Sequence, residues 1–409
     1  MKSGLTGAAS ARLPDVFSSL RAIAGVAILL TSLAFPQAHS AKQEAPTSDL
    51  TVHEWGTFTS ISADDGQAIE WLPLTGSTDL PTFVEHLREP AFKGGLRGTV
   101  RMETPVLYFY SPRETSVSVA VSFAKGLITE WYPHAVPLAA FNPRTDFSLD
   151  QKCTVGGISW NSVQVEPAAS ADFPRDVREN HYYAARETSS APIRVQTPSG
   201  NQRERFLFYR GVSAFAPPIT ATISVDGSVL IQNHLSEEIP DVIVFERRGK
   251  TVGYRVLGPL RNEAALAPPP LEGSLDSLFS DLEGILISQG LHADEAHAML
   301  ETWKNSWFED GSRLFYIVPR GFVDSVLPLS ISPAPAEITR VFVGRDELIT
   351  PATKQAVESA FASNDRATLA KYSRFLPTIL QTMIDESTDP SQQRRLSSYL
   401  DSLYNHPLP

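Results

Sequence analysis

Residues 51–62, TVHEWGTFTSIS, place a histidine next to a glutamate near the start of a strand-like stretch. An imidazole and a carboxylate can act together as acid and base, or they can bind one metal ion. On a strand, however, adjacent side chains point to opposite faces, so His53 and Glu54 cannot hold one ion together unless a bulge intervenes. Gly56 is a position where such a bulge could form. Chemistry at His53 therefore needs partners from elsewhere in the chain.

Polar residues of the N-terminal half are the candidate partners for His53: His86, Glu103, His134 and His181. Three histidine or carboxylate ligands with one open position would make a zinc site of the catalytic kind. The chain contains no H-E-x-x-H motif and no closely spaced histidine pair in this half, so the sequence identifies neither a metal nor a cofactor. The structural interpretation is that His53 and Glu54 hydrogen-bond neighbouring loops and fix the N-terminal strand.

Glu103 stands at the entrance of a very apolar strand, in the segment RMETPVLYFY at 101–110. A half-buried carboxyl group has a raised pKa, which suits acid–base work. Glu103 can equally form an ion pair with Arg101 or Arg97, and we take the ion pair as the main interpretation.

The segment 181–188, HYYAARET, combines His181 with Tyr182 and Tyr183. Aromatic faces next to carboxylates and amides suit sugar rings, and they also suit protein interfaces. Most such aromatic residues in a β-sandwich belong to the core or its edge, which is the alternative interpretation. If they form a binding surface, a glycan or a protein is the ligand class that they favour. The candidate catalytic residues that the sequence nominates are His53, Glu54, Glu103 and His181.

Other polar patterns are interpreted as structural. His297 and Glu301 share one helix face close to His292, but the apolar stripe of that helix lies on another side, so we expect the pair in solvent. The stretch 62–67, SADDGQ, lacks the alternating ligands of a calcium loop and predicts a turn. Cys153 is interpreted as a small buried residue.

Alternating apolar and polar residues predict antiparallel strands between about 50 and 260. The stretch 116–123, SVSVAVSF, alternates strictly, and Lys125-Gly126 predicts a turn from it into 127–132. Glycine turns predict two hairpins, which join 219–225 to 228–234 and 241–247 to 251–257. Short strands with closely spaced turns favour a β-sandwich-like arrangement.

Beyond the proline-rich segment EAALAPPPLEG, the apolar period becomes that of helices. Residues 275–286 and about 293–308 each carry one apolar stripe, and Thr350-Pro351 and Asp389-Pro390 are typical helix starts. The stretches 313–320 and 338–345 are predicted strands. We therefore predict an α+β fold in these parts: a β-sandwich-like domain at 48–262, a Pro-rich linker at 263–273, and an α-rich domain with a few strands at 274–409.

The first 40 residues have the pattern of an export signal. Arg12 and Arg21 precede the apolar run 22–35, which is too short to span a bilayer as a helix. Small residues at Ala38 and Ser40 predict cleavage after about Ser40, with 41–47 as a linker; an uncleaved amphipathic anchor is the alternative. We expect an extracytoplasmic protein, periplasmic or secreted, without integral membrane association after cleavage.

The chain is acidic, with a formal net charge of −11 at pH 7. Nucleic acids and anionic membranes call for clustered Lys and Arg, so this balance argues against both as partners. Because there is one cysteine, no intramolecular disulfide can form, and an exported domain must be held by its apolar core.

The chain resembles a group of uncharacterised secreted bacterial proteins in the segments VHEWGTFTS, WLPL, DLPTFV, RMETPVLYFY, HYYAARET and ETWKNSWFEDGSRLFYIVPR. The similarity covers most of the chain beyond residue 40. It implies export and a shared fold, and it brings no known reaction, cofactor or catalytic residue.

The first functional hypothesis is a binding or assembly role outside the cytoplasm, through the aromatic and acidic surface of the β part. It rests on missing signatures, since the chain has no G-x-S-x-G, P-loop, G-x-G-x-x-G or C-x-x-C motif. The alternative is an extracytoplasmic hydrolase of glycan or peptide bonds that uses the four nominated residues as acid, base or metal ligands. The sequence leaves open whether the protein is an enzyme.

Overall fold

The computed structural model describes residues 49–63, 65–71, 80–87, 98–138, 156–224, 226–372 and 375–405, which belong to one compact unit. The predicted export signal, the linker 41–47, Arg97 and Cys153 lie outside these residues. In the described part of the chain, none of the helices has both the length and the apolar character that a membrane span requires.

The strands are β1 (Thr51–Ser62), β2 (Glu85–His86), β3 (Val100–Tyr110), β4 (Thr115–Phe123), β5 (Gly126–Tyr132), β6 (Val136–Pro137), β7 (Gly156–Val165), β8 (Ile193–Thr197), β9 (Gly200–Glu204), β10 (Leu207–Ser213), β11 (Ile219–Ile223), β12 (Val229–Asn233), β13 (Ile239–Arg248), β14 (Thr251–Leu260), β15 (Glu263–Leu266), β16 (Gly311–Val318), β17 (Leu329–Ser332) and β18 (Glu337–Leu348). The helices are the 3-10 helix η1 (His181–Arg186) and α1 (Leu275–Ser288), α2 (Ala293–Trp307), α3 (Arg320–Val326), α4 (Pro351–Ser363), α5 (Arg366–Lys371), α6 (Leu376–Glu386) and α7 (Pro390–Asn405).

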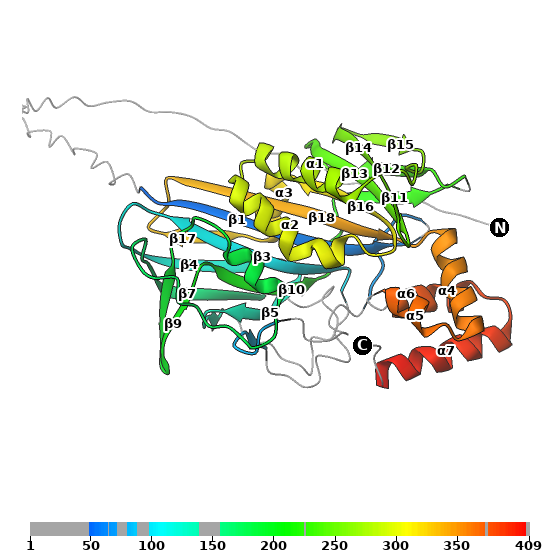
Figure 1. The fold of residues 1–409 in the computed structure, drawn as a ribbon, viewed down its shortest axis with the longest axis horizontal. Coiled ribbons are helices and arrows are strands. Elements are labelled where there is room, and N and C mark those ends of the chain that lie inside the picture. The colour runs from blue at the N-terminus through cyan, green and yellow to red at the C-terminus, as the bar shows by residue number, and fades with distance from the viewer. Residues whose placement is uncertain are drawn as a thin grey trace, which may run out of the picture. The chain divides into compact units, whose positions relative to one another are not determined.

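β1 lies near the middle of a nine-stranded sheet with the order β14-β13-β16-β18-β1-β3-β10-β5-β2 (Figure 1). It pairs antiparallel with β3 and parallel with β18. Both of its faces are buried, because side chains that alternate along the strand enter two different cores. Val52 and Phe58 enter the first core, and Trp55 enters the second. The α+β class is confirmed, and the parallel pair was not expected from the sequence.

A second sheet has the order β17-β4-β7-β8-β9, with β6 beside β7. Its apolar side chains join those of β1 and β3 in the first core. The predicted turn from 116–123 into the strand 127–132 is confirmed, but the two strands do not pair, because β4 belongs to this sheet and β5 to the nine-stranded one. Between them the chain changes sheets at Gly126, where a Cβ atom would lie 2.8 Å from the Val212 carbonyl oxygen.

The predicted hairpins at the two glycine turns are confirmed as β11–β12 and β13–β14. The predicted division at 263–273 differs from the structure. Part of that segment is β15, which pairs with β12, and β16 and β18 from beyond it join β13 and β1 in one sheet. The prolines of this segment do not end the nine-stranded sheet, because β13 before them pairs with β16 after them.

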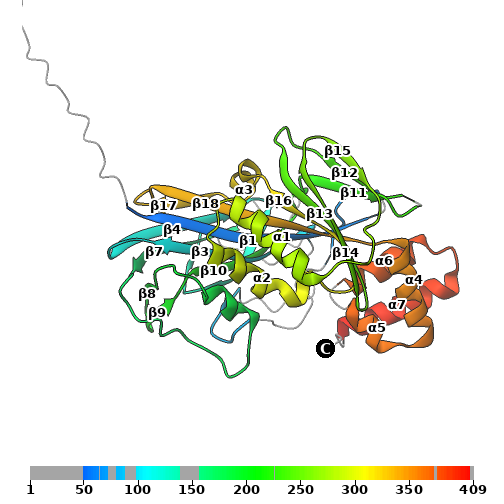
Figure 2. The same ribbon diagram turned by 45° about the horizontal axis from the view of Figure 1, so that its top comes forward.

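α1 and α2 lie over the face of the nine-stranded sheet that carries Trp55, and they close the second core (Figures 1 and 2). Their predicted ranges are confirmed, since apolar stripes at helical spacing bury Leu278, Leu282, Met299 and Trp303. α4 to α7 form a third core with Ile61 at the far end of β1. His53 of β1 lies under the N-terminal end of α2, where it contacts Glu295.

Asp346 of β18 is a buried carboxyl group whose hydrogen-bond donors are hydroxyls. Asp346 is 3% exposed, and its carboxyl group accepts hydrogen bonds from Ser60 Oγ at 2.9 Å and from Ser62 Oγ at 2.5 Å. Burial raises the pKa of Asp346 to about 7, whereas an unfolded aspartate has a pKa of about 3.9. Folding therefore favours the protonated carboxyl group. This contribution to stability is present below pH about 4 and is lost as pH rises through about 7.

Asparagine at position 346 cannot ionise, so the Asp346→Asn variant is expected to lose this pH dependence. At about pH 8 its free energy of unfolding should exceed that of the parent by a few kcal/mol, because one pKa unit corresponds to about 1.4 kcal/mol. At about pH 4.5 the difference should shrink. Urea unfolding at both pH values measures it, and an equal difference at the two pH values contradicts the account.

Candidate functional site

His53 meets the start of α2 through a carboxylate that lies far away in the sequence. Its Nδ1 atom is 2.8 Å from Oε2 of Glu295, and both side chains are buried. Glu295 is the third residue of α2, and its Oε2 also accepts a hydrogen bond from the backbone N–H of the N-cap residue His292 at 2.8 Å. That contact is one half of a capping box, which fixes the carboxylate at the helix end.

Tyr110, at the end of β3, completes the arrangement from the neighbouring strand. Its hydroxyl donates to Oε1 of Glu295 at 2.8 Å. Burial and the negative charge of Glu295 raise the pKa of Tyr110, so the phenol stays protonated and keeps donating. We call His53, Tyr110, His292 and Glu295 the His53 cluster.

The three aromatic rings of the His53 cluster contact one another in tilted or edge-to-face orientations. The ring centroids of His53 and His292 are 4.5 Å apart, those of Tyr110 and His292 4.8 Å, and those of His53 and Tyr110 5.3 Å. His292 is exposed, whereas His53 and Glu295 are buried. Solvent therefore reaches the cluster from the side of His292.

Three members of the cluster have the donor atoms of a metal site. One ligand atom each of His53, His292 and Glu295 lies within 4.8 Å of the other two. In a tetrahedral zinc site with bonds of about 2.0–2.1 Å, neighbouring ligand atoms are about 3.3 Å apart. Small side-chain movements would therefore bring the three donors to one ion. Among the described residues, this is the group of three His, Cys, Asp or Glu side chains that meets the distance condition.

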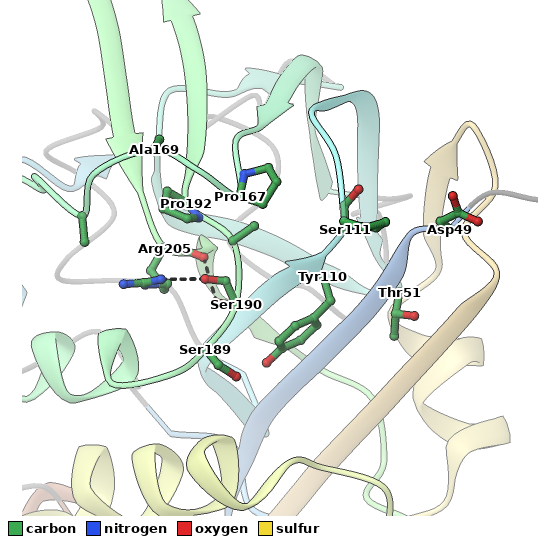
Figure 3. A pocket seen from close by; sticks show the side chains of 13 residues that line it. Asp49, Thr51, Tyr110, Ser111, Pro167, Ala169, Ser189, Ser190, Pro192 and Arg205 are labelled. Carbon is green, nitrogen blue, oxygen red and sulfur yellow. Dashed lines mark hydrogen bonds between the residues drawn. The ribbon is translucent and has the colours of Figure 1, made fainter.

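A cavity of about 440 Å³ meets the cluster at Tyr110, which lies in its wall (Figure 3). Tyr110 lines it and at the same time contacts Glu295. Thr51 lines it too, and on β1 it shares a face with His53. The other lining residues are Asp49, Ser111, Pro112, Pro167, Ala169, Ala171, Ser189, Ser190, Ala191, Pro192 and Arg205.

Glu54 points away from His53, as the strand geometry predicts. Its carboxylate is fully buried and accepts hydrogen bonds from Nε of Arg340 and from the Tyr209 hydroxyl. Arg340 also donates to Oδ1 of Asp324 at 2.7 Å. Burial alone would lower the pKa of Arg340, but the Glu54 carboxylate raises it, so the guanidinium stays charged. Glu54 is therefore one half of a buried ion pair.

Glu103 is also held in place by neighbours. Oε1 lies 3.6 Å from Nε of Arg101, and Oε2 accepts from Thr59 at 3.1 Å, so the predicted ion pair with Arg101 is confirmed. Glu103 pairs across the sheet with Thr57, which is four residues from His53 and thus roughly 13 Å along β1.

The remaining histidines considered above lie outside the His53 cluster. The ring of His181 packs at a tilt against that of Trp303, with ring centroids 5.7 Å apart. His134 contacts Glu85 at 2.9 Å, and His86 lies 3.9 Å from Glu130. His297 pairs with Glu283 at 3.5 Å on the surface. The structure therefore brings His53 to none of the partners nominated for it.

Sequence reasoning missed Tyr110 and Glu295 and placed His292 in the wrong group. One signal for Glu295 was available: it follows His292 by three residues at a helix start, where a capping glutamate sits. Its contact with His53 spans 242 residues and has no local signal.

No family model matches the chain, and no curated protein matches its sequence. Among solved structures, the chain is similar to the Fcho1 Mu homology domain of Danio rerio with bound Eps15 peptide, at 8% identity and a TM-score of 0.28, over 75% of this chain and 98% of that one. It is also similar to the yeast delta-COP-I mu-homology domain complexed with Dsl1 WxWxV peptide, at 10% identity and a TM-score of 0.24, over 74% and 98%.

Proposed function

We propose that this protein is an extracytoplasmic binding protein that holds a divalent transition-metal ion of the zinc type at His53, His292 and Glu295. One observation carries the proposal: a donor atom from each of these side chains lies within 4.8 Å of the other two. Two imidazoles and one carboxylate are a donor set that zinc accepts, and harder cations such as Mg²⁺ prefer oxygen alone.

The contacts around the three donors support a site that is built before the ion arrives. Tyr110 holds Oε1 of Glu295, and the N-cap N–H of His292 holds Oε2. Such outer contacts orient the ligands of metal sites. An ion would replace the hydrogen bond between His53 and Glu295 and leave the other two contacts in place.

A second function, metal-dependent hydrolysis of a glycan or peptide bond, is favoured by the cavity beside the cluster. Three protein ligands leave a position open for water, as in catalytic zinc sites. The cavity of about 440 Å³ falls in the range of small-molecule sites. Tyr110 lines the cavity while its hydroxyl proton goes to Glu295, so its phenol oxygen is left to accept a hydrogen bond from a substrate.

We further propose that the two large sheets form a β-sandwich. In support, the first core contains Val119 and Val121 of β4 together with Phe58 of β1 and Leu107 of β3. The rings of Phe58 and Phe123, from the two sheets, stack with centroids 6.5 Å apart.

Export remains part of the proposal and is supported by the sequence. The apolar run at 22–35 and the small residues before position 41 fit a cleaved signal. The resemblance to secreted bacterial proteins supports the same location.

Calorimetric titration of the purified, chelator-treated protein with ZnCl₂ tests the metal site. We expect saturable binding of one equivalent, and binding of MgCl₂ and CaCl₂ that is far weaker, because the site offers two imidazole nitrogens. Binding that does not saturate, or an equal affinity for Mg²⁺, contradicts the proposal.

A further inference from the structure

We propose that the cavity beside the His53 cluster binds a small oxyanion, a carboxylate or a phosphate group, on Arg205. This inference names the ligand class of the cavity. It rests on the proposed function only where it places the ligand next to a metal ion.

Arg205 is a positioned cation without a carboxylate partner. In the described part of the chain it forms no ion pair, whereas its neighbours Arg186, Arg194 and Arg203 each pair with a glutamate at 2.6, 2.6 and 3.2 Å. Holding a half-buried guanidinium without a counter-ion costs free energy, and an anionic ligand would remove that cost.

The guanidinium of Arg205 is nevertheless fixed. Its Nη1 donates to the carbonyl oxygen of Ser190 at 2.6 Å, and its central carbon lies 5.3 Å from the ring centroid of Phe173. Its Nε is buried and has no hydrogen-bond partner. The buried Nε is out of reach of a ligand, but the guanidinium keeps its remaining terminal N–H groups for one, and these match carboxylate and phosphate oxygens.

The rest of the cavity wall suits the same ligand. Thr51 and Ser189 contribute hydroxyl groups, which can donate to oxyanion oxygens. Among the described residues, Asp49 supplies the one carboxylate that lines the cavity, and it lies 3.0 Å from Arg113.

The wall continues from Arg205 to the His53 cluster. Figure 3 shows Ser190 next to Arg205 and Tyr110 between Ser189 and Thr51. Beyond Ser189, its backbone N–H donates to Oδ2 of Asp294 at 2.7 Å, one residue before Glu295. A ligand anchored by its oxyanion at Arg205 has room to extend toward Tyr110, and the cavity volume limits it to a small molecule or the end of a chain.

Titration of inorganic phosphate and of acetate, separately, into the zinc-free and the zinc-loaded protein tests this inference. We expect saturable binding of at least one of the two anions in the zinc-free protein. Phosphate alone identifies a phosphate ligand, acetate alone identifies a carboxylate, and binding of neither overturns the inference.

The matched variants are Arg205→Met and Arg203→Met. Arg203 is close in sequence, but it is paired with Glu166, which Arg194 also contacts. The dissociation constant of the bound anion should rise about tenfold or more in Arg205→Met and stay unchanged in Arg203→Met. Equal values in the parent and Arg205→Met overturn the inference. Zinc affinity should not change in either variant, so loss of zinc binding with intact anion binding refutes the metal site alone.

A measurement on the parent protein keeps the test independent of how the variants fold. Phenylglyoxal modifies accessible arginines, and mass spectrometry of peptides gives the rate at each one. The bound anion should slow modification of Arg205 and leave that of the exposed Arg320 on α3 unchanged. An equal rate at Arg205 with and without the anion overturns the inference.

Discussion

Replacing Arg340 with methionine is expected to destabilise the protein by about 3–5 kcal/mol, which is the usual cost of breaking a buried ion pair from one side. Arg340 and Glu54 are both buried, and the side chain of each is at most 1% exposed. Without the guanidinium, the Glu54 carboxylate would keep only the Tyr209 hydroxyl among its hydrogen-bond partners named above. A buried carboxylate with its charge uncompensated is what destabilises the variant.

Arg320→Met is the matched control, because Arg320 pairs with the same Asp324 at 2.7 Å but is 43% exposed. An exposed pair of this kind contributes about 0–1 kcal/mol. Adding Glu54→Gln to Arg340→Met should recover part of the lost stability, since the unpaired charge is gone. Urea unfolding at neutral pH measures all four proteins. If Arg340→Met is no less stable than Arg320→Met, the ion pair does not hold β1 to β18.

Replacing His53 with alanine is expected to lower the affinity for Zn²⁺ by at least about 100-fold, because one of three ligands is lost. Tyr110→Phe removes only the hydroxyl that orients Glu295. Its expected effect is smaller, about 10–100-fold, which is the range for contacts that support a ligand. Competition with a zinc chelator of known affinity measures both.

His297→Ala is the matched control for the zinc measurement. His297 is in the same helix as Glu295, but it is exposed and lies 3.5 Å from Glu283. We expect its zinc affinity to equal that of the parent. If His53→Ala and His297→Ala bind zinc equally well, His53 is not a ligand. Circular dichroism of each variant shows whether a change in affinity comes with loss of the fold.

Local signals in the sequence predicted the helices and the two glycine hairpins. The helical period gave the ranges of α1 and α2, and Thr350 caps α4 as expected. The turn between β4 and β5 was predicted correctly, but the sequence did not show that this turn carries the chain from one sheet to the other. The turn chemistry is local, whereas the choice of sheet depends on distant partners.

One of the four residues of the candidate site could be read from the sequence. His53 was identified from its type and its neighbours, and strand geometry correctly separated it from Glu54. Glu295 could not be connected to it, because the contact joins β1 to α2 across 242 residues and depends on how α2 lies over the sheet. The same holds for Glu54 and Arg340, which pair only because β18 lies parallel to β1.

Anomalous X-ray diffraction from a zinc-soaked crystal, recorded on both sides of the zinc absorption edge, tests the metal site most directly. We expect one strong anomalous peak within about 2.0–2.2 Å of a ligand atom from each of His53, His292 and Glu295. A crystal with full zinc occupancy elsewhere and no peak at these residues would contradict the central claim. The His53 cluster would then be a buried hydrogen-bond network that fixes α2 on the sheet.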